Sequence, residues 1–100
     1  MNKPFIVQID IDLQEILPKF IENRQKDLEM IKIYLENKDL IKIEVIAHKL
    51  AGNAGSYGFT HLGKIGLELE AACQSADLNT IKSKYEEYLN YMKFVQVEFV

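Results

Sequence analysis

The sequence contains one cysteine, two prolines and no tryptophan, and it has no long apolar run. Because Cys73 is alone, the chain cannot form an internal disulfide, and nothing in it calls for an oxidising compartment. A membrane-spanning helix needs about 20 consecutive apolar residues, which no segment approaches. The N-terminal stretch MNKPFIVQIDID turns acidic before a secretory signal could be complete. We therefore expect a cytoplasmic protein with no membrane partner.

The chain also lacks a large excess of charge of either sign. Twelve Lys and Arg residues stand against 15 Asp and Glu, a formal net charge of −3 at pH 7. Nucleic-acid-binding domains usually carry a basic patch, so this balance gives no reason to expect a nucleic-acid partner. A hydrophobic content of 48% argues against disorder, and 100 residues can fold without metal or disulfide support. We expect one domain over residues 1–100, and a monomer.

Helical periodicity dominates from residue 12 onward. Apolar residues recur at steps of three and four over residues 18–36, 40–56 and 60–76, and again after Asp77. Asp39 and Asp77 stand where helix N-caps are expected, and Gly58 stands where a left-handed residue would end a helix. Short connections between amphipathic helices favour antiparallel neighbours. The predicted fold class is therefore all-α, an antiparallel up-down-up-down four-helix bundle.

The N-terminal residues are less regular than the rest. Asp10 and Asp12 are good N-caps for the segment DLQEIL, and Pro18 removes one helical hydrogen bond behind it. We therefore expect a short extra N-terminal helix with a break at Pro18. The stretch FIVQI gives a weak strand signal, which we predict to be too isolated to pair.

The apolar positions of these helices define the predicted core. The positions expected to face inward are Leu17, Phe20, Ile21, Leu28, Ile31, Leu35, Ile43, Ile46, Ala47, Leu50, Ala54, Tyr57, Leu62, Ile65, Gly66, Leu69, Cys73, Leu78, Ile81, Tyr85, Tyr88, Leu89, Met92 and Val95. Cys73 belongs to this set, so we interpret it as a packing residue. With His48 and His61 it lacks the close ligand spacing of a zinc site.

One histidine stands apart from the core pattern. The stretch AHKLAGNAGSYG places His48 inside a predicted helix and follows it with Gly52 and Gly55. An ideal helix advances about 100° per residue, so His48 projects about 200° away from its neighbours Ile46 and Leu50. Each interior glycine costs a helix about 1 kcal/mol relative to alanine. Bare backbone beside an outward imidazole favours access by another macromolecule.

Less specific interpretations of the same residues stay open. A single exposed histidine is ordinarily a surface residue, and small residues often permit close helix crossing. Close crossing explains Gly66, on the inward face, better than it explains Gly52 or Gly55. His61 begins the third predicted helix, and we interpret it as an incidental cap or surface residue.

A nucleotide-binding loop is not expected. The segment GFTHLGKI comes close to the phosphate-binding pattern G-x-x-x-x-G-K-[ST], but it ends in Ile65 and follows no strand. The protein should therefore not phosphorylate itself from ATP.

The run from His48 to Glu70, HKLAGNAGSYGFTHLGKIGLELE, resembles the histidine-containing phosphotransfer (HPt) domain. That family's pattern is a histidine, an apolar residue two positions on, glycines four and ten positions on, a further leucine and then a Leu-Glu pair. The matching positions are Leu50, Gly52, Gly58, Leu62, Leu69 and Glu70. The upstream DIDLQEILPKFIENRQKDL resembles the N-terminal helices of one branch of the family, so the likeness covers nearly the whole chain.

The resemblance implies a role in a multistep two-component phosphorelay. His48 would be the phosphoacceptor nucleophile, taking a phosphoryl group through Nε2 from a receiver-domain aspartyl phosphate and passing it to another receiver aspartate. The implied partners are response-regulator receiver domains, with a hybrid histidine kinase as a further candidate. No cofactor is expected on this chain, because the receiver brings Mg²⁺. The face around His48 that we expect to bind partners comprises Glu44, Val45, Lys49, Ala51, Gly52, Gly55 and Lys64.

Three questions stay open from the sequence. Many family members have lysine or arginine three residues after the histidine, where this chain has Ala51, so Lys49 or Lys64 would have to offset the phosphoryl charge. Arg24 interrupts an apolar stripe, and pairing with Glu70 would explain it. The alternatives to phosphotransfer are an adaptor that binds a receiver or kinase without phosphate, and the phosphoacceptor module of a chemotaxis-type kinase.

Overall fold

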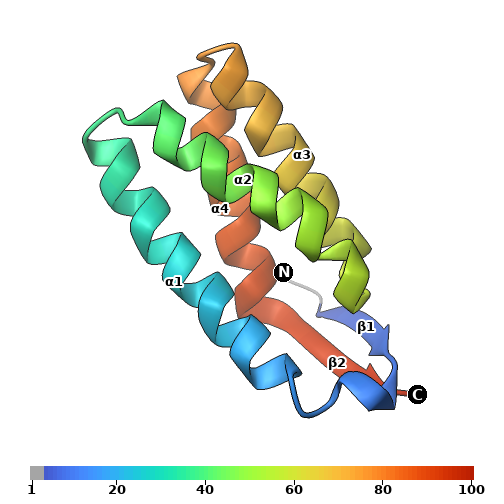
Figure 1. The fold of residues 1–100 in the computed structure, drawn as a ribbon. Coiled ribbons are helices and arrows are strands. Elements are labelled where there is room, and N and C mark those ends of the chain that lie inside the picture. The colour runs from blue at the N-terminus through green and yellow to red at the C-terminus, as the bar shows by residue number, and fades with distance from the viewer. Residues whose placement is uncertain (1–3) are drawn as a thin grey trace.

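The computed structural model describes residues 4–100 and is mostly helical (Figure 1). Four helices pack together, and a short strand lies at each end of the chain. The elements in chain order are β1 (Phe5–Ile9), a 3₁₀ turn (Ile11–Leu13), α1 (Leu17–Glu36), α2 (Leu40–Asn53), a second 3₁₀ turn (Gly55–Tyr57), α3 (Thr60–Gln74), α4 (Leu78–Phe94) and β2 (Val95–Phe99).

The predicted bundle of four packed helices is confirmed. Successive helices run in opposite directions, with α1 and α3 rising and α2 and α4 returning in the view of Figure 1. The buried residues form a single apolar cluster to which all four helices contribute. Cys73 is part of this cluster, as expected.

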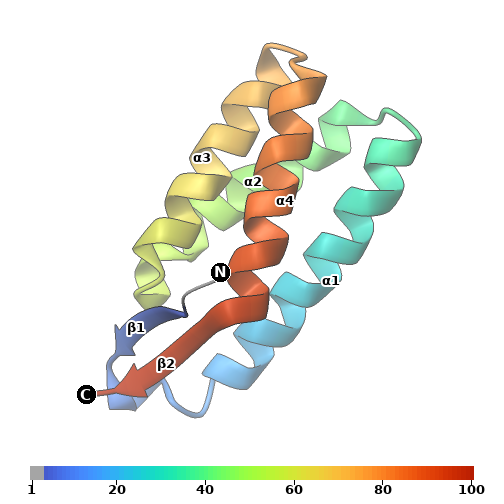
Figure 2. The same ribbon diagram turned by 180° about the vertical axis from the view of Figure 1, so that it is seen from behind.

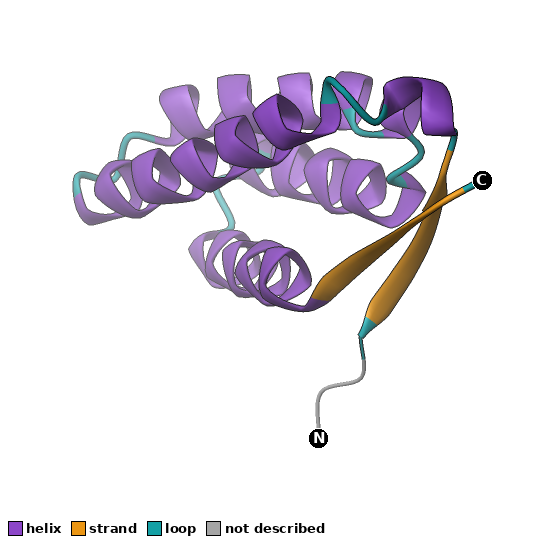
Figure 3. Cartoon of the chain, turned by 90° about the horizontal axis from the view of Figure 1, so that it is seen from below, coloured by secondary structure: helices purple, strands orange, loops and turns teal. Residues whose placement is uncertain are grey.

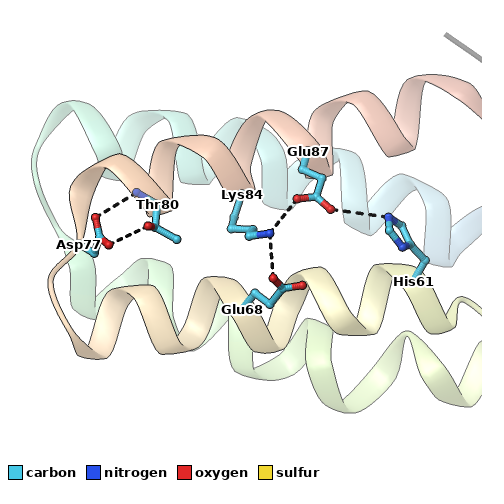
Figure 4. Close-up of polar contacts among 6 residues, drawn as sticks. All are labelled: His61, Glu68, Asp77, Thr80, Lys84 and Glu87. Carbon is cyan, nitrogen blue, oxygen red and sulfur yellow. Dashed lines mark hydrogen bonds and ion pairs between the residues drawn. The ribbon is translucent and has the colours of Figure 1, made fainter.

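Three predicted helix-end signals are confirmed. The Asp39 side chain accepts a hydrogen bond from the amide of Lys42 at 3.3 Å, and Asp77 accepts one from the amide of Thr80 at 3.2 Å (Figure 4). These side chains satisfy amides that the first turn of a helix leaves unpaired. Gly58 has a φ of +94°, the left-handed conformation expected beyond the end of the second helix. That helix is shorter than predicted, because residues 55–57 form a 3₁₀ turn.

The prediction of an extra N-terminal helix is wrong. The only helical turn among the described residues before α1 is the 3₁₀ turn at Ile11–Leu13, which Asp10 caps by accepting a hydrogen bond from the amide of Asp12. One turn fixes several backbone dihedrals for a single hydrogen bond, so a helix this short is not stable alone. Pro18 lies in the first turn of α1, where its missing amide costs nothing.

The prediction that FIVQI stays unpaired is also wrong. It forms β1, which pairs in parallel with β2 in the register Phe5 to Val95 through Ile9 to Phe99. The two strands lie together at one end of the helices in Figures 2 and 3. Val95 was predicted to continue the last helix, but it begins β2 instead. The sheet therefore ties the two ends of the described chain together.

The inward face of α4 differs from the prediction at three positions. Leu78 and Leu89 were expected in the core but are 37% and 40% exposed, whereas Tyr91 is buried. Tyr88 is fully buried, and Leu89 lies about 100° further round the helix, which turns it outward. Tyr91, three residues after Tyr88, continues the buried stripe.

A row of charged residues joins α3 to α4 (Figure 4). The Lys84 ammonium lies 2.9 Å from Glu68 and 3.0 Å from Glu87, and these hydrogen bonds raise the pKa of Lys84. His61 lies 3.7 Å from Glu87 and stacks on Phe5 of β1. His61 makes no cap hydrogen bond at the start of α3. Its contacts are those of a half-exposed packing residue.

Over residues 4–100, no helix combines the length and the apolar character needed to cross a membrane.

Candidate functional site

His48 points outward from the middle of α2. Its side chain is 76% exposed, while Ala47 and Leu50 beside it are buried. The outward direction predicted from the helical period is the direction that the structure shows. The imidazole is therefore accessible from solvent, on a helix that is anchored by core residues on its other face.

A carboxylate of α3 holds one nitrogen of this ring. Nδ1 of His48 lies 2.7 Å from Oε2 of Glu70. An ionised carboxylate can only accept hydrogen bonds, so this contact requires the proton to be on Nδ1. In the neutral ring the lone pair then lies on Nε2. Glu70 thus selects the tautomer in which Nε2 is the nucleophilic nitrogen.

The close approach of α2 and α3 makes this contact possible. A Cβ atom on Gly66 would lie 2.7 Å from the amide nitrogen of Ala51 and 3.0 Å from the carbonyl oxygen of Ala47. Only a glycine fits at that distance. Close packing is the role that the sequence favoured for Gly66, and the structure agrees.

A shallow hollow lies beside the imidazole. Glu44 lies one turn before His48 and accepts a hydrogen bond at 3.3 Å from Nε2 of Gln74. The lining of the hollow comes from one face of α2 and from one residue of α3. Its residues are Ile41, Glu44, Val45, His48, Lys49 and Glu70.

Exposed apolar side chains lie on the two helices that carry His48 and Glu70. Ile41 is 77% exposed and Val45 50% exposed on α2, and Leu67 is 59% exposed on α3. Sequence reasoning placed Val45 on the face around His48 but missed Ile41, which lines the hollow with it. Ile41 could have been found, because it lies four residues before Val45 and off the inward stripe.

The other predicted partner-binding residues lie in different surroundings. A Cβ atom on Gly52 or Gly55 would meet nothing within 4 Å, so neither glycine is needed for close packing. Ala51 is half-buried, with its backbone against Gly66. Lys49 lines the hollow, whereas Lys64 is exposed on α3 outside it.

The suggested pairing of Arg24 with Glu70 is wrong. Nε of Arg24 lies 2.9 Å from Oδ2 of Asp27, one turn further along α1, and the guanidinium stacks over the ring of Phe20. Burial raises the pKa of Asp27, although Arg24 and Lys49 partly oppose that rise. Arg24 therefore completes a local pair on α1, and Glu70 remains free for His48.

Among residues 4–100, no group of three or more His, Cys, Asp or Glu side chains is placed to hold a metal ion. Burial raises the pKa of Cys73 to about 11, so its thiol stays protonated near neutral pH.

Comparison with known protein families matches residues 15–92 to the Hpt domain. Comparisons with curated proteins and with solved structures return no match. The family match spans well over half of the chain and includes His48 together with Glu70. Hpt domains serve in phosphorelay signalling and typically interact with receiver domains and kinases. The chain therefore belongs to the Hpt domain family.

Proposed function

We propose that the chain is a histidine phosphotransfer protein of a multistep phosphorelay, with His48 as the phosphoacceptor. The observation that carries this proposal is the pairing of His48 with Glu70. Nδ1 is held by a carboxylate at 2.7 Å, and the side chain is 76% exposed. A nucleophile for a macromolecular donor must combine fixed orientation with access, and this side chain has both.

The transfer is a displacement at phosphorus. The Nε2 lone pair of His48 forms a bond to phosphorus as the bond to the aspartyl oxygen of the donor receiver breaks, and that carboxylate leaves. The reverse displacement, by the aspartate of a second receiver, restores the neutral imidazole. The receiver supplies Mg²⁺, which offsets charge on the phosphoryl oxygens during the transfer. Glu70 keeps the Nδ1 proton in place through both steps.

The surface around His48 supports docking of a folded partner. Ile41 and Val45 offer apolar contact area two turns and one turn before the histidine, respectively, and Gly52 leaves the backbone open one turn after it. A receiver domain that covers these residues would exclude water from the reacting atoms. Exclusion of water protects an aspartyl phosphate from hydrolysis during transfer.

The test of this proposal is incubation with a panel of receiver domains that have been phosphorylated with acetyl phosphate. Intact mass spectrometry should show one added phosphoryl group on this chain with at least one receiver, and loss of the label when a second receiver is added. Stable binding of a receiver with no phosphoryl transfer would instead identify an adaptor, and the proposal would be wrong.

Gly52→Gln tests whether the open backbone serves docking. A Cβ atom at position 52 meets nothing within 4 Å, so helix propensity predicts a gain in stability of up to about 1 kcal/mol. The glutamine side chain would stand between the imidazole and a receiver, and a displacement of about 1 Å can slow transfer on the order of 10²-fold. This variant should therefore have a higher melting temperature and a slower transfer rate than wild type. A less stable variant with normal transfer per folded molecule would contradict the docking role.

Glu70→Gln tests the orientation of the imidazole. Glutamine keeps the shape of the side chain but replaces a charge-assisted hydrogen bond with a neutral one, which is about half as strong. The loss is about 1 kcal/mol, so transfer from a receiver should slow about 5- to 10-fold. Nitrogen-15 shifts of the ring should show wild-type His48 protonated on Nδ1 and the variant as a mixture of tautomers. A variant that keeps the wild-type tautomer and rate would remove Glu70 from this role.

A further inference from the structure

The immediate surroundings of His48 are acidic. The hollow beside the imidazole has two carboxylates, Glu44 and Glu70, and Lys49 is the single basic side chain that lines it among the described residues. Glu70 already accepts a hydrogen bond from Nδ1 of His48. Glu44 forms no ion pair with a basic side chain within the described part of the chain, and the hydrogen bond that it accepts comes from the neutral side-chain amide of Gln74. A second carboxylate is thus held one helical turn from the phosphoacceptor.

The basic residues that could offset this charge also face other carboxylates. Lys49 is near enough to Asp27 of α1 to lower the pKa of that carboxyl, against the larger effect of burial. The pKa of Glu68 is lowered chiefly by its hydrogen bond with Lys84, and Lys64 is near enough to lower it further. Position 51, one turn from His48, is alanine. The described site therefore has no cation dedicated to the phosphoryl group.

We infer that Glu44 destabilises the phosphorylated form of His48, so that the protein hands the phosphoryl group on instead of storing it. This inference rests on the proposed function. It assigns Glu44 an electrostatic role in setting the transfer equilibrium. Phosphoaspartate on the receiver is favoured over phosphohistidine on this chain to the extent that Glu44 is charged.

The size of the effect follows from the helical spacing. Residues four apart on a helix have Cβ atoms about 5–6 Å apart, and like charges there repel by about 0.2–0.5 kcal/mol. A phosphoryl group carries nearly two negative charges at neutral pH, so the repulsion about doubles. Removing the charge of Glu44 should therefore shift the equilibrium toward phosphohistidine by about 2- to 5-fold.

A direct exchange of the phosphoryl group between wild type and variant measures this shift, because the equilibrium ratio does not depend on which receiver carries the group. Wild-type protein is loaded with phosphoramidate, the reagent is removed, and an equal amount of nitrogen-15-labelled Glu44→Gln is added. A trace of a receiver domain that proved active in the panel then carries phosphoryl groups between the two, and intact mass separates the four species. We expect the phosphoryl group to collect on Glu44→Gln by about 2- to 5-fold, and less so in about 1 M salt, where the screening length falls to about 3 Å.

The matched control is Glu86→Gln. It removes the same charge from an exposed position of α4, a helix that packs on α1 and α3. Its exchange constant against wild type should stay near one. An exchange constant near one for Glu44→Gln would overturn the inference, and so would an equal shift for both variants.

The inference can fail separately from the proposed function. Loss of the phosphoryl group to water after loading with phosphoramidate requires no receiver, and repulsion should make it faster in wild type than in Glu44→Gln. Equal half-lives would overturn the role of Glu44 even where receivers exchange phosphate normally. If no receiver exchanges phosphate but the half-lives differ as expected, the relay role fails and the electrostatic role of Glu44 stands. If phosphoramidate does not label His48, both are wrong.

Discussion

Replacing His48 with glutamine should abolish phosphoryl acceptance and leave the fold intact. The side chain is 76% exposed, so its removal takes little from the core, and a surface substitution usually changes stability by less than about 0.5 kcal/mol. Glutamine has an amide that can still donate a hydrogen bond to Glu70, but it has no nucleophilic nitrogen. Intact mass after incubation with phosphoramidate or a phosphorylated receiver should show no added phosphoryl group. The melting temperature should stay within a few degrees of wild type.

The control for this experiment is His61→Gln. His61 is the other histidine of the chain, and it is stacked on Phe5 with Glu87 at 3.7 Å. It lies on the α3 face that meets α4 and β1, away from the hollow beside His48. We expect His61→Gln to accept the phosphoryl group at the wild-type level. Labelling that persists in His48→Gln, or that maps to His61, would refute the assignment of the nucleophile.

The helical part of this fold could be predicted because its signals are local. Asp39 and Asp77 cap the helices that follow them, and Gly58 takes the left-handed conformation that only glycine adopts without strain. Each of these signals depends on residues within one or two turns. The inward stripes likewise depend on a period of 3.6 residues, which a single helix displays in its own sequence.

The sheet could not be predicted in the same way, because its pairing joins opposite ends of the chain. Phe5 pairs with Val95, and a strand as weak as FIVQI predicts no partner at that separation. The sequence of β2 nevertheless contains a strand signal. The residues of β2 read VQVEF, an alternation of apolar and polar residues that a strand favours and a helix does not. It was missed because the preceding helix ends without a glycine or proline to mark the change.

The candidate site likewise has one feature that could be predicted from local sequence and one that could not. The outward direction of His48 follows from the helical period of its own segment, so it could be predicted. Its contact with Glu70 spans 22 residues and a helix connection, and depends on how closely α2 and α3 approach. From the sequence, a pairing of Glu70 with Arg24 is no more than an open suggestion, and Arg24 contacts Asp27, three residues away. A contact between helices requires the crossing geometry, and no residue pattern within one helix contains it.

Gly66 fixes that crossing, and Gly66→Ala should weaken both stability and transfer. A Cβ atom there would lie 2.7 Å from one backbone atom of α2 and 3.0 Å from another, and backbone cannot rotate out of the way. Overpacking costs about 1–3 kcal/mol or more, against about 1 kcal/mol gained in helix propensity. Because both contacts are with backbone, we place the cost in the upper part of that range and expect a net loss of about 1–2 kcal/mol, which lowers the melting temperature by roughly 4–16 °C in a domain of this size.

Gly63→Ala is the matched control for this experiment, because Gly63 is buried on the same face of α3 one turn earlier. Its added Cβ would meet its nearest neighbours at 3.6–3.9 Å, which is ordinary contact, so this variant should keep or slightly raise the melting temperature. If α2 moves away from α3 to accommodate the methyl group added at position 66, the 2.7 Å contact between His48 and Glu70 must lengthen as well. Phosphoryl acceptance per folded molecule should then fall in Gly66→Ala and not in Gly63→Ala. Equal melting temperatures for the two variants would show that the helices tolerate a wider crossing, and the spacing of His48 and Glu70 would need another cause.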